Sequence, residues 1–376
     1  MQRLPDFDGL RFILCLGIAT FHYSFRIPID NEFITSVVLR FSYFTDIFFI
    51  VSGLFLARRA YGTWDRRQYF AFQAKRLARI YPLHVATFSC FALISIAYAY
   101  GFINPNAQPD TNWQNAITQL FLLHSWGLGS TFSYNYVSWS LSALFLMYLC
   151  FPLFDVLSKR FGVGILAALI IAIIGGELLT RMLGGPSLTR AQFTNFGILR
   201  VLPSFLFGMW LVRHQNIVLP KSLTYLGLTI CLLIFLFYSP ADVDGHTVVL
   251  EGPARLIFLY VFTFLLYNAS TQGLYTPLQW SGFANLSRYS FGIFILHPLV
   301  GLFFFNAIPP FWENSVAGSL FIIAAGVTVA VLVAAISWKI FENPINSWLV
   351  AKINKWQSHG ATLPFKNQLK ANKIQQ

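Results

Sequence analysis

VAGSLFIIAAGVTVAVLVAAISWKI, residues 316–340, contains no charged side chain before Lys339. A helix needs about 20 consecutive apolar residues to cross the hydrocarbon core of a bilayer, so this segment is predicted to be a transmembrane helix. The composition extends this prediction to the rest of the chain, because 56% of its 376 residues are hydrophobic and only 11% are charged. A soluble domain carries about 25% charged residues. The expected fold class is therefore an all-α polytopic membrane protein.

Nine further apolar segments resemble this one, which predicts a bundle of about ten transmembrane helices. The predicted spans are residues 10–27, 41–57, 80–102, 137–157, 161–180, 196–212, 222–239, 254–271, 283–305 and 316–340. Residues 113–126 are too short and polar to cross, and we expect them to lie along the interface or to re-enter. The spans define a transmembrane domain at residues 1–350 and a short basic tail at residues 351–376, which we expect to be disordered after Trp348.

Lysine and arginine are retained on the cytoplasmic side of a membrane, so their distribution predicts the orientation of the chain. If the N-terminus is cytoplasmic, 20 of the 26 Lys and Arg residues fall at cytoplasmic ends or loops and six fall on the other side. Both termini are therefore predicted to be cytoplasmic. The net charge of +12 does not indicate nucleic-acid binding, because the cations lie between apolar runs. The four cysteines have no metal or disulfide spacing, and no metal site is expected.

Arg11 and His22 lie eleven residues apart on the first predicted span. At about 100° and 1.5 Å per residue, the two side chains share one helix face and are separated by about 16 Å along the axis. Ionisable groups at this depth usually face a cavity or a partner. His22 is therefore either a hydrogen-bonded interior histidine or a general base that takes the proton of a hydroxyl group.

A cluster of cations precedes the third predicted span. Lys75, Arg76 and Arg79 end a basic loop that begins at Arg58, and Arg76 and Arg79 are adjacent on a helix face at the membrane surface. Guanidinium groups match the geometry of phosphates, which favours a phosphate-binding role. The alternative is that these cations only set the topology and attract anionic lipids.

Polar residues also mark the predicted outer ends of two spans. Asp46 precedes an apolar run that contains Ser52. It is either a polar residue at a helix start or an acid that orients an imidazole or binds a sugar hydroxyl. Trp139 and Ser140 begin the fourth span, where they are either belt and packing residues or substrate contacts.

The ninth span contains a second deep histidine, His297, which follows Tyr289 and precedes the helix-bending Pro298. Only His22 and His297 among the deep residues can accept a hydroxyl proton, because Arg stays charged and Tyr titrates near pH 10. His22 is preferred because it shares a face with Arg11, and His297 is then a wall or orienting residue, although the two roles could be exchanged. The other histidines are expected to be interface or loop residues without a role: His84, His124, His214, His246 and His359.

Seven short motifs in order make the chain resemble the acyltransferase 3 family of membrane-bound O-acyltransferases, of the kind that acylates bacterial surface glycans. They are DGLR at residues 8–11 with His22, DIFFIVSG at 46–53, RLARIYP at 76–82, SWSLS at 138–142, RVLP at 200–203, YSFG at 289–292 with HP at 297–298, and FENP at 341–344. Each motif is weak alone, but the ordered set spans residues 8–344.

The resemblance implies ten helices in the bacterial cytoplasmic membrane and cytoplasmic acyl-CoA, with acetyl-CoA expected, as the donor substrate rather than a bound cofactor. It implies transfer to a hydroxyl of an extracytoplasmic glycan or lipid-linked sugar. His22 is then the catalytic base, with Arg11 and Asp46 as catalytic partners. The cations that face the CoA phosphates are Lys75, Arg76 and Arg79. The residues with substrate-binding or structural roles are Ser52, Trp139, Ser140, Tyr289, His297 and Glu342.

The chain departs from the family pattern in two respects. Many members carry a glutamate shortly after the Trp-Ser-Leu motif, whereas residues 143–145 read ALF here. Any acid or sugar-binding role of that glutamate is therefore absent or taken by Asp46, Glu177 or Glu313. Many members also carry an additional extracytoplasmic domain, and this chain ends in a basic tail instead. Two other functions stay open: a proton-coupled transporter of a small or lipid-linked solute that uses both deep histidines, and a non-catalytic subunit of a polysaccharide pathway.

Overall fold

The computed structural model describes residues 4–59, 62–103, 108–128, 133–185, 197–214, 217–238, 250, 252–307 and 315–359. Across these ranges the elements are helices and short helical turns, and no strand is formed. Helices cover all ten predicted spans. The longer helices are α1 (Pro5–Ser24), α3 (Phe44–Ala57), α4 (Arg66–Ala99), α6 (Ser138–Phe161), α7 (Gly164–Met182), α8 (Gly197–Arg213), α9 (Lys221–Phe237), α10 (Gly252–Thr271), α12 (Ser290–Asn306), α13 (Val316–Ser337) and α14 (Asn343–His359). The shorter ones are α2 (Glu32–Arg40), α5 (Trp113–Leu120) and α11 (Ser281–Leu286).

Within the described ranges, seven helical stretches are long and apolar enough to cross a bilayer, which makes the chain an integral membrane protein. They are Glu32–Ala57, Arg66–Ala99, Ser138–Phe161, Gly164–Met182, Gly252–Thr271, Ser281–Asn306 and Val316–Ser358. The predicted spans on α1, α8 and α9 are not among them, since α8 and α9 have only 17 residues each and α1 carries Asp6, Asp8 and Arg11. A total of ten spans, with both termini cytoplasmic, therefore stays a prediction.

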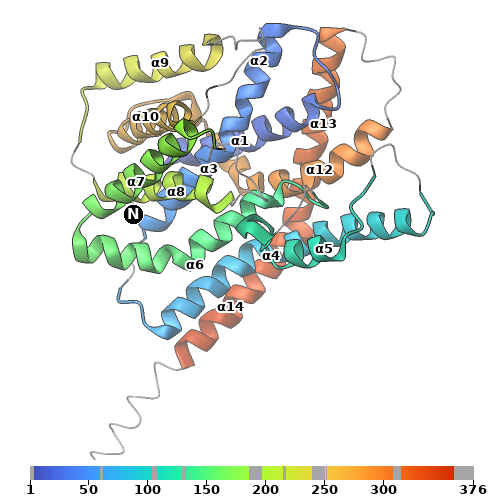
Figure 1. Ribbon diagram of the computed structural model, residues 1–376, viewed down its shortest axis with the longest axis horizontal. Helices are drawn as coiled ribbons and strands as arrows, with labels where there is room; N and C mark the ends of the chain where they lie inside the picture. Colours follow the sequence, from blue (N-terminus) through green and yellow to red (C-terminus); the bar gives the residue numbers. More distant parts are fainter. Residues whose placement is uncertain are drawn as a thin grey trace, which may run out of the picture.

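Helix α1 occupies the centre of the bundle and contacts α2, α3, α11, α12 and α13 (Figure 1). Its buried residues point in all directions around the helix, which is typical of a helix enclosed by others. Arg11 and His22 are therefore carried by a central helix. The predicted non-crossing segment at residues 113–126 contains α5, whose eight residues are too short to cross.

Two glycines allow α3 and α8 to pack with their backbones in contact. A Cβ atom on Gly53 would lie 2.0 Å from the carbonyl oxygen of Phe205, and one on Gly208 would lie 1.9 Å from that of Ile50. Small residues at helix crossings are the usual means of close packing in membranes. This crossing fixes α3, which contributes a long wall to the candidate site.

Helix α4 begins at Arg66, and the prediction of a basic loop up to residue 79 is wrong for residues 66–79. The Asp65 carboxylate accepts a hydrogen bond from the Gln68 amide at 2.7 Å and caps the helix. Its 34 residues extend about 51 Å, well beyond the roughly 30 Å hydrocarbon core. The cations Lys75, Arg76 and Arg79 are therefore held in fixed positions on a helix.

The predicted disorder after Trp348 is wrong as far as His359, because α14 continues to that residue. Figure 1 shows α14 beside the first half of α4, and the two helices are in contact. The Lys75 ammonium donates to Gln357 Oε1 at 3.1 Å, and the Arg67 guanidinium lies 4.9 Å from the Trp356 ring centroid. Packing against a partner helix orders a segment that is polar by composition. Residues 360–376 of the predicted tail, as well as His246 and Glu313, lie outside the described residues.

Candidate active site

Two cavities lie along α1. The larger, of about 560 Å³, is lined by residues of α1, α3, α4, α6, α12 and α14. Its described lining has five cations and no acid: Arg11, Arg59, Lys75, Arg76 and Arg79. We call it the basic cavity. Ser52 and Ser140 also line it, so it collects six of the residues that the sequence singled out.

The basic cavity is elongated along α3. Thr45, Phe48, Ser52 and Phe55 line it at helical spacing, and this stripe of ten residue steps corresponds to about 15 Å. Arg59, two residues beyond the end of α3, continues the lining. One end carries cations, and the other end is apolar. Such a shape suits an extended molecule with an anionic head and a thin, less polar arm.

The cations of the basic cavity are oriented by aromatic and polar neighbours. The Arg79 guanidinium lies 4.7 Å from the Trp338 ring centroid and 3.5 Å from the Glu342 carboxylate. Arg76 stacks on Phe72 at 5.7 Å, and its Nε atom is buried without a hydrogen-bond partner among the residues that the structure describes. A buried guanidinium nitrogen without a protein partner is suited to an incoming anion.

The second cavity, of about 450 Å³, surrounds His22 and is called the histidine cavity. Aromatic side chains form much of its wall, and Arg26 is the only charged residue in its described lining. The aromatic lining residues are Phe21, Tyr23, Phe25, Tyr136 and Trp139. The Tyr136 ring packs edge-on against His22 with centroids 5.0 Å apart. Aromatic faces beside polar groups favour binding of a sugar or another amphipathic ligand.

The two deep histidines are in direct contact, which the sequence had not predicted. His22 Nδ1 lies 2.9 Å from His297 Nε2, and the two rings lie edge to edge with 13° between their planes. His297 Nδ1 lies 3.2 Å from the Ile293 carbonyl oxygen, and the Tyr23 hydroxyl donates to the His297 carbonyl at 2.9 Å. His297 is thus fixed through both its ring and its backbone.

These contacts assign the tautomers of a neutral pair. A carbonyl oxygen can only accept, so His297 Nδ1 carries a hydrogen and its Nε2 is an acceptor. His22 Nδ1 must then be the donor of the bond between the rings. The remaining nitrogen of His22, Nε2, consequently carries a lone pair. In this arrangement His22 is the potential base and His297 the orienting residue.

Asp46 lies in a buried ion cluster rather than beside the histidines. Its carboxylate is paired with Arg200 at 2.8 Å and with Arg255 at 2.6 Å, and its exposed fraction is 0%. Arg200 also stacks on Trp139, with its guanidinium carbon 5.0 Å from the ring centroid. No hydrogen bond joins Asp46 to either histidine in the described part of the chain, so its predicted catalytic role has no direct geometric support.

The remaining predicted residues are placed as follows. Tyr289 and Glu177 line neither cavity, and Glu342 contacts the basic cavity through Arg79. The prediction that His84 and His124 are interface or loop residues is wrong, because both are buried and hydrogen-bonded to Gln119 and Ser138, respectively. The sequence did not single out Tyr136, because this residue precedes α6 and lies in a segment without helical periodicity.

The comparisons with known proteins agree with the motifs. Residues 4–338 match the Acyltransferase domain of the acyltransferase 3 family. The chain is 25% identical over 374 residues to Acyltransferase MdmB of Streptomyces mycarofaciens, with 91% of each chain covered. It is 27% identical over 267 residues to ORF330 of Acidianus two-tailed virus, named as a candidate acetyltransferase, with 68% of this chain and 71% of that protein covered. No solved structure matches the chain. The chain therefore belongs to the acyltransferase 3 family and is an acyltransferase.

Proposed function

We propose that this enzyme transfers an acyl group, with acetyl expected, from cytoplasmic acyl-CoA to a hydroxyl group of an extracytoplasmic glycan or lipid-linked sugar, in the bacterial cytoplasmic membrane. The observation that carries the proposal is the position of the two cavities on α1. Arg11 lines the basic cavity and His22 lines the histidine cavity, eleven residues along the same helix. A donor entering at the cations and an acceptor entering at His22 would approach each other along α1.

The donor assignment is supported by charge and shape. CoA carries phosphates at one end and a long, thin pantetheine arm that ends in the thioester. The five cations of the basic cavity complement the phosphates, and the stripe along α3 accommodates the arm. The cytoplasmic location of the cations, predicted from the charge distribution, matches the compartment in which acyl-CoA is made.

The reaction requires one proton to move. His22 Nε2 removes the hydroxyl proton of the acceptor as its oxygen attacks the thioester carbonyl. A C–O bond forms, the C–S bond breaks, and the proton held by His22 passes to the departing CoA thiolate. His297 keeps the unprotonated Nε2 of His22 directed at the acceptor through the 2.9 Å bond between the rings.

The test compares surface glycans and lipid-linked sugars by mass spectrometry in cells that carry the wild-type gene, no gene, or the His22→Gln variant. An acyl mass increment is expected only with the wild-type gene, because an amide cannot accept the hydroxyl proton. His214→Gln is a matched control, since His214 stacks on Trp210 and lines neither cavity. Full acylation by the His22→Gln variant would show that His22 is not the base. Solute transport that does not depend on CoA would favour a transporter function instead.

A further inference from the structure

Four aromatic side chains stand between the basic cavity and the histidine cavity. Phe48, Phe49 and Phe294 line the basic cavity, and Trp139 lines the histidine cavity. The Phe294 ring centroid lies 6.4 Å from that of Phe48, and Phe49 packs edge-on against Trp139 at 6.1 Å. We call these four residues the aromatic partition. A donor and an acceptor held in the two cavities meet at this layer.

Phe294 lies beside the histidine pair. Its ring centroid lies 6.3 Å from that of His297, whose ring is in turn hydrogen-bonded to His22 with 5.1 Å between the centroids. Phe294 and His297 are three residues apart on α12, so they lie on the same side of the helix. A thioester that approaches His22 from the basic cavity therefore reaches Phe294 first.

Phe48 supports Phe294 from the opposite helix. It is carried by α3, whose position is fixed by the close backbone crossing with α8 at Gly53 and Gly208. The Phe294 ring is thus confined between His297 on its own helix and Phe48 on another. A confined ring at the end of an elongated cavity limits what can be accommodated there.

We propose that Phe294, backed by Phe48, limits the length of the acyl group that the enzyme accepts. This inference rests on the proposed function, in which the thioester lies at the apolar end of the basic cavity. The methyl group of acetyl requires little room beyond the carbonyl, whereas each added methylene extends toward the ring of Phe294. One methylene in a confined apolar pocket changes discrimination by about 10–200-fold, so a single phenylalanine can determine donor choice.

The test measures the affinity of the purified full-length protein for CoA, acetyl-CoA, butyryl-CoA and octanoyl-CoA by calorimetry, which requires no acceptor. The wild-type protein should bind acetyl-CoA more tightly than octanoyl-CoA. Phe294→Ala should raise the affinity for butyryl-CoA relative to acetyl-CoA by about tenfold or more. Phe294→Leu, which disturbs packing less, should shift this ratio in the same direction by a smaller factor, as should Phe48→Leu.

Phe303→Ala is the matched control. Phe303 lies on the same helix beyond Pro298, is 64% exposed and lines neither cavity, so its replacement should leave the ratio unchanged. An unchanged ratio in Phe294→Ala and Phe294→Leu would overturn the role of Phe294, as would equal binding of acetyl-CoA and octanoyl-CoA by the wild-type protein. If no CoA compound binds the wild-type protein, the donor assignment itself fails. The two failures are therefore distinguishable.

Discussion

His22 and His297 form a hydrogen-bonded, nearly coplanar pair across α1 and α12, with 2.9 Å between His22 Nδ1 and His297 Nε2. The tautomer of His22 is therefore set by another imidazole and not by a carboxylate. A neutral imidazole orients its partner but stabilises a newly formed imidazolium less than an anion does. This difference favours a reaction in which the proton leaves His22 as soon as the thiolate departs.

The pair predicts unequal effects of two substitutions. His22→Ala should remove the base and lower the rate of acyl transfer by about 10²–10⁴-fold. His297→Ala should lower kcat by a smaller factor, because His22 keeps a basic nitrogen but loses its orientation. Rates measured at saturating acyl-CoA, together with acyl-CoA affinity, test both expectations.

The double variant separates the two roles. If His297 acts only through His22, the variant with both alanines should be no slower than His22→Ala alone, because residues that act as a unit are not additive. A larger loss in His297→Ala than in His22→Ala would exchange the roles and make His297 the base.

Arg76 offers the cleanest test of the donor site. Arg76→Ala should weaken acyl-CoA binding by about 1.5–3 kcal/mol, the range for a lost charge-assisted contact. Arg76→Lys should recover part of this loss, because Lys lacks the planar fork. Arg79→Ala should also weaken binding, but it leaves the buried Glu342 without its ion-pair partner, so the protein should lose stability as well.

Arg160 provides a control for nonspecific charge effects on CoA binding. It lies at the end of α6, stacks on Phe161 and lines neither cavity. Arg160→Ala should leave the calorimetric affinity for acyl-CoA unchanged. If the Arg76→Ala, Arg79→Ala and wild-type proteins bind acyl-CoA with equal affinity, these two arginines only determine the topology.

The orientation can be tested separately from the chemistry. Reporter fusions at Gly162 and at Gln376 should report the cytoplasm, and a fusion at Asp110 should report the opposite side. With this orientation, 20 of the 26 Lys and Arg residues are cytoplasmic and six lie on the other side. Translocation of Lys and Arg across the membrane is disfavoured, so this distribution supports the orientation. A C-terminus on the outer side would place the basic cavity away from cytoplasmic CoA and contradict the proposed mechanism.

The sequence predicts the helices well because long apolar runs have few structural alternatives. Residues 137–157 correspond to α6, and residues 254–271 correspond to α10. Lys75, Arg76 and Arg79 lie in one cavity, and Arg11, which the sequence had placed with His22, lines this cavity instead of the one around His22. The apolar runs are local features of the sequence, and the cations of the donor site follow from the order of motifs along the chain.

Contacts between distant residues could not be predicted from one sequence. Asp46 pairs with Arg200, 154 positions away, and nothing near Asp46 in the sequence indicates this partner. The contact between His22 and His297 spans 275 positions. Helix α14 was misjudged for a related reason, because its order depends on packing against α4 and not on its own hydrophobicity.

The crossing of α3 and α8 should be sensitive to a single methyl group. Gly208→Ala places a Cβ against the Ile50 carbonyl oxygen, and backbone atoms cannot give way without separating the helices. We expect a loss of about 1–3 kcal/mol in the free energy of unfolding, as for other overpacked sites. Gly175→Ala on α7, where a Cβ meets no atom within 4 Å, should be neutral or slightly stabilising. Equal thermal unfolding midpoints for the two variants would contradict this packing.

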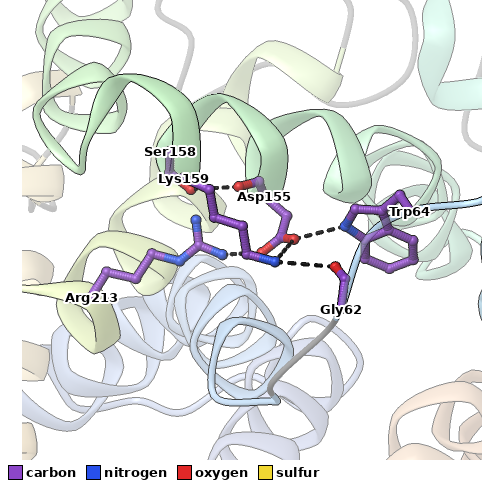
Figure 2. A network of polar contacts seen from close by, with 6 residues as sticks. All are labelled: Gly62, Trp64, Asp155, Ser158, Lys159 and Arg213. Carbon is purple, nitrogen blue, oxygen red and sulfur yellow. Dashed lines mark hydrogen bonds and ion pairs between the residues drawn. The ribbon is translucent and has the colours of Figure 1, made fainter.

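Asp155 anchors the segment that leads into α4 (Figure 2). Its carboxylate accepts from Trp64 Nε1 at 2.7 Å, lies 2.8 Å from the Lys159 ammonium and pairs with Arg213 of α8. The carboxylate is 2% exposed, so its charge is balanced by these partners and not by water. Because Trp64 lies only two residues before α4, this network fixes the helix that carries three cations of the basic cavity.

Asp155→Asn should lower the free energy of unfolding by about 3 kcal/mol, the lower end of the range for breaking a buried ion pair, because Lys159 is half exposed. Asn keeps an acceptor for Trp64 but leaves the partly buried Arg213 without its counter-charge. Arg213→Gln in the Asp155→Asn background should therefore restore part of the stability, whereas Lys159→Ala alone should cost less than 1 kcal/mol. Thermal unfolding in detergent measures all of these. If Asp155→Asn costs no more than Lys159→Ala, the network does not hold the start of α4, and the order of the basic cavity must come from the packing of α4 against α6, α12 and α14.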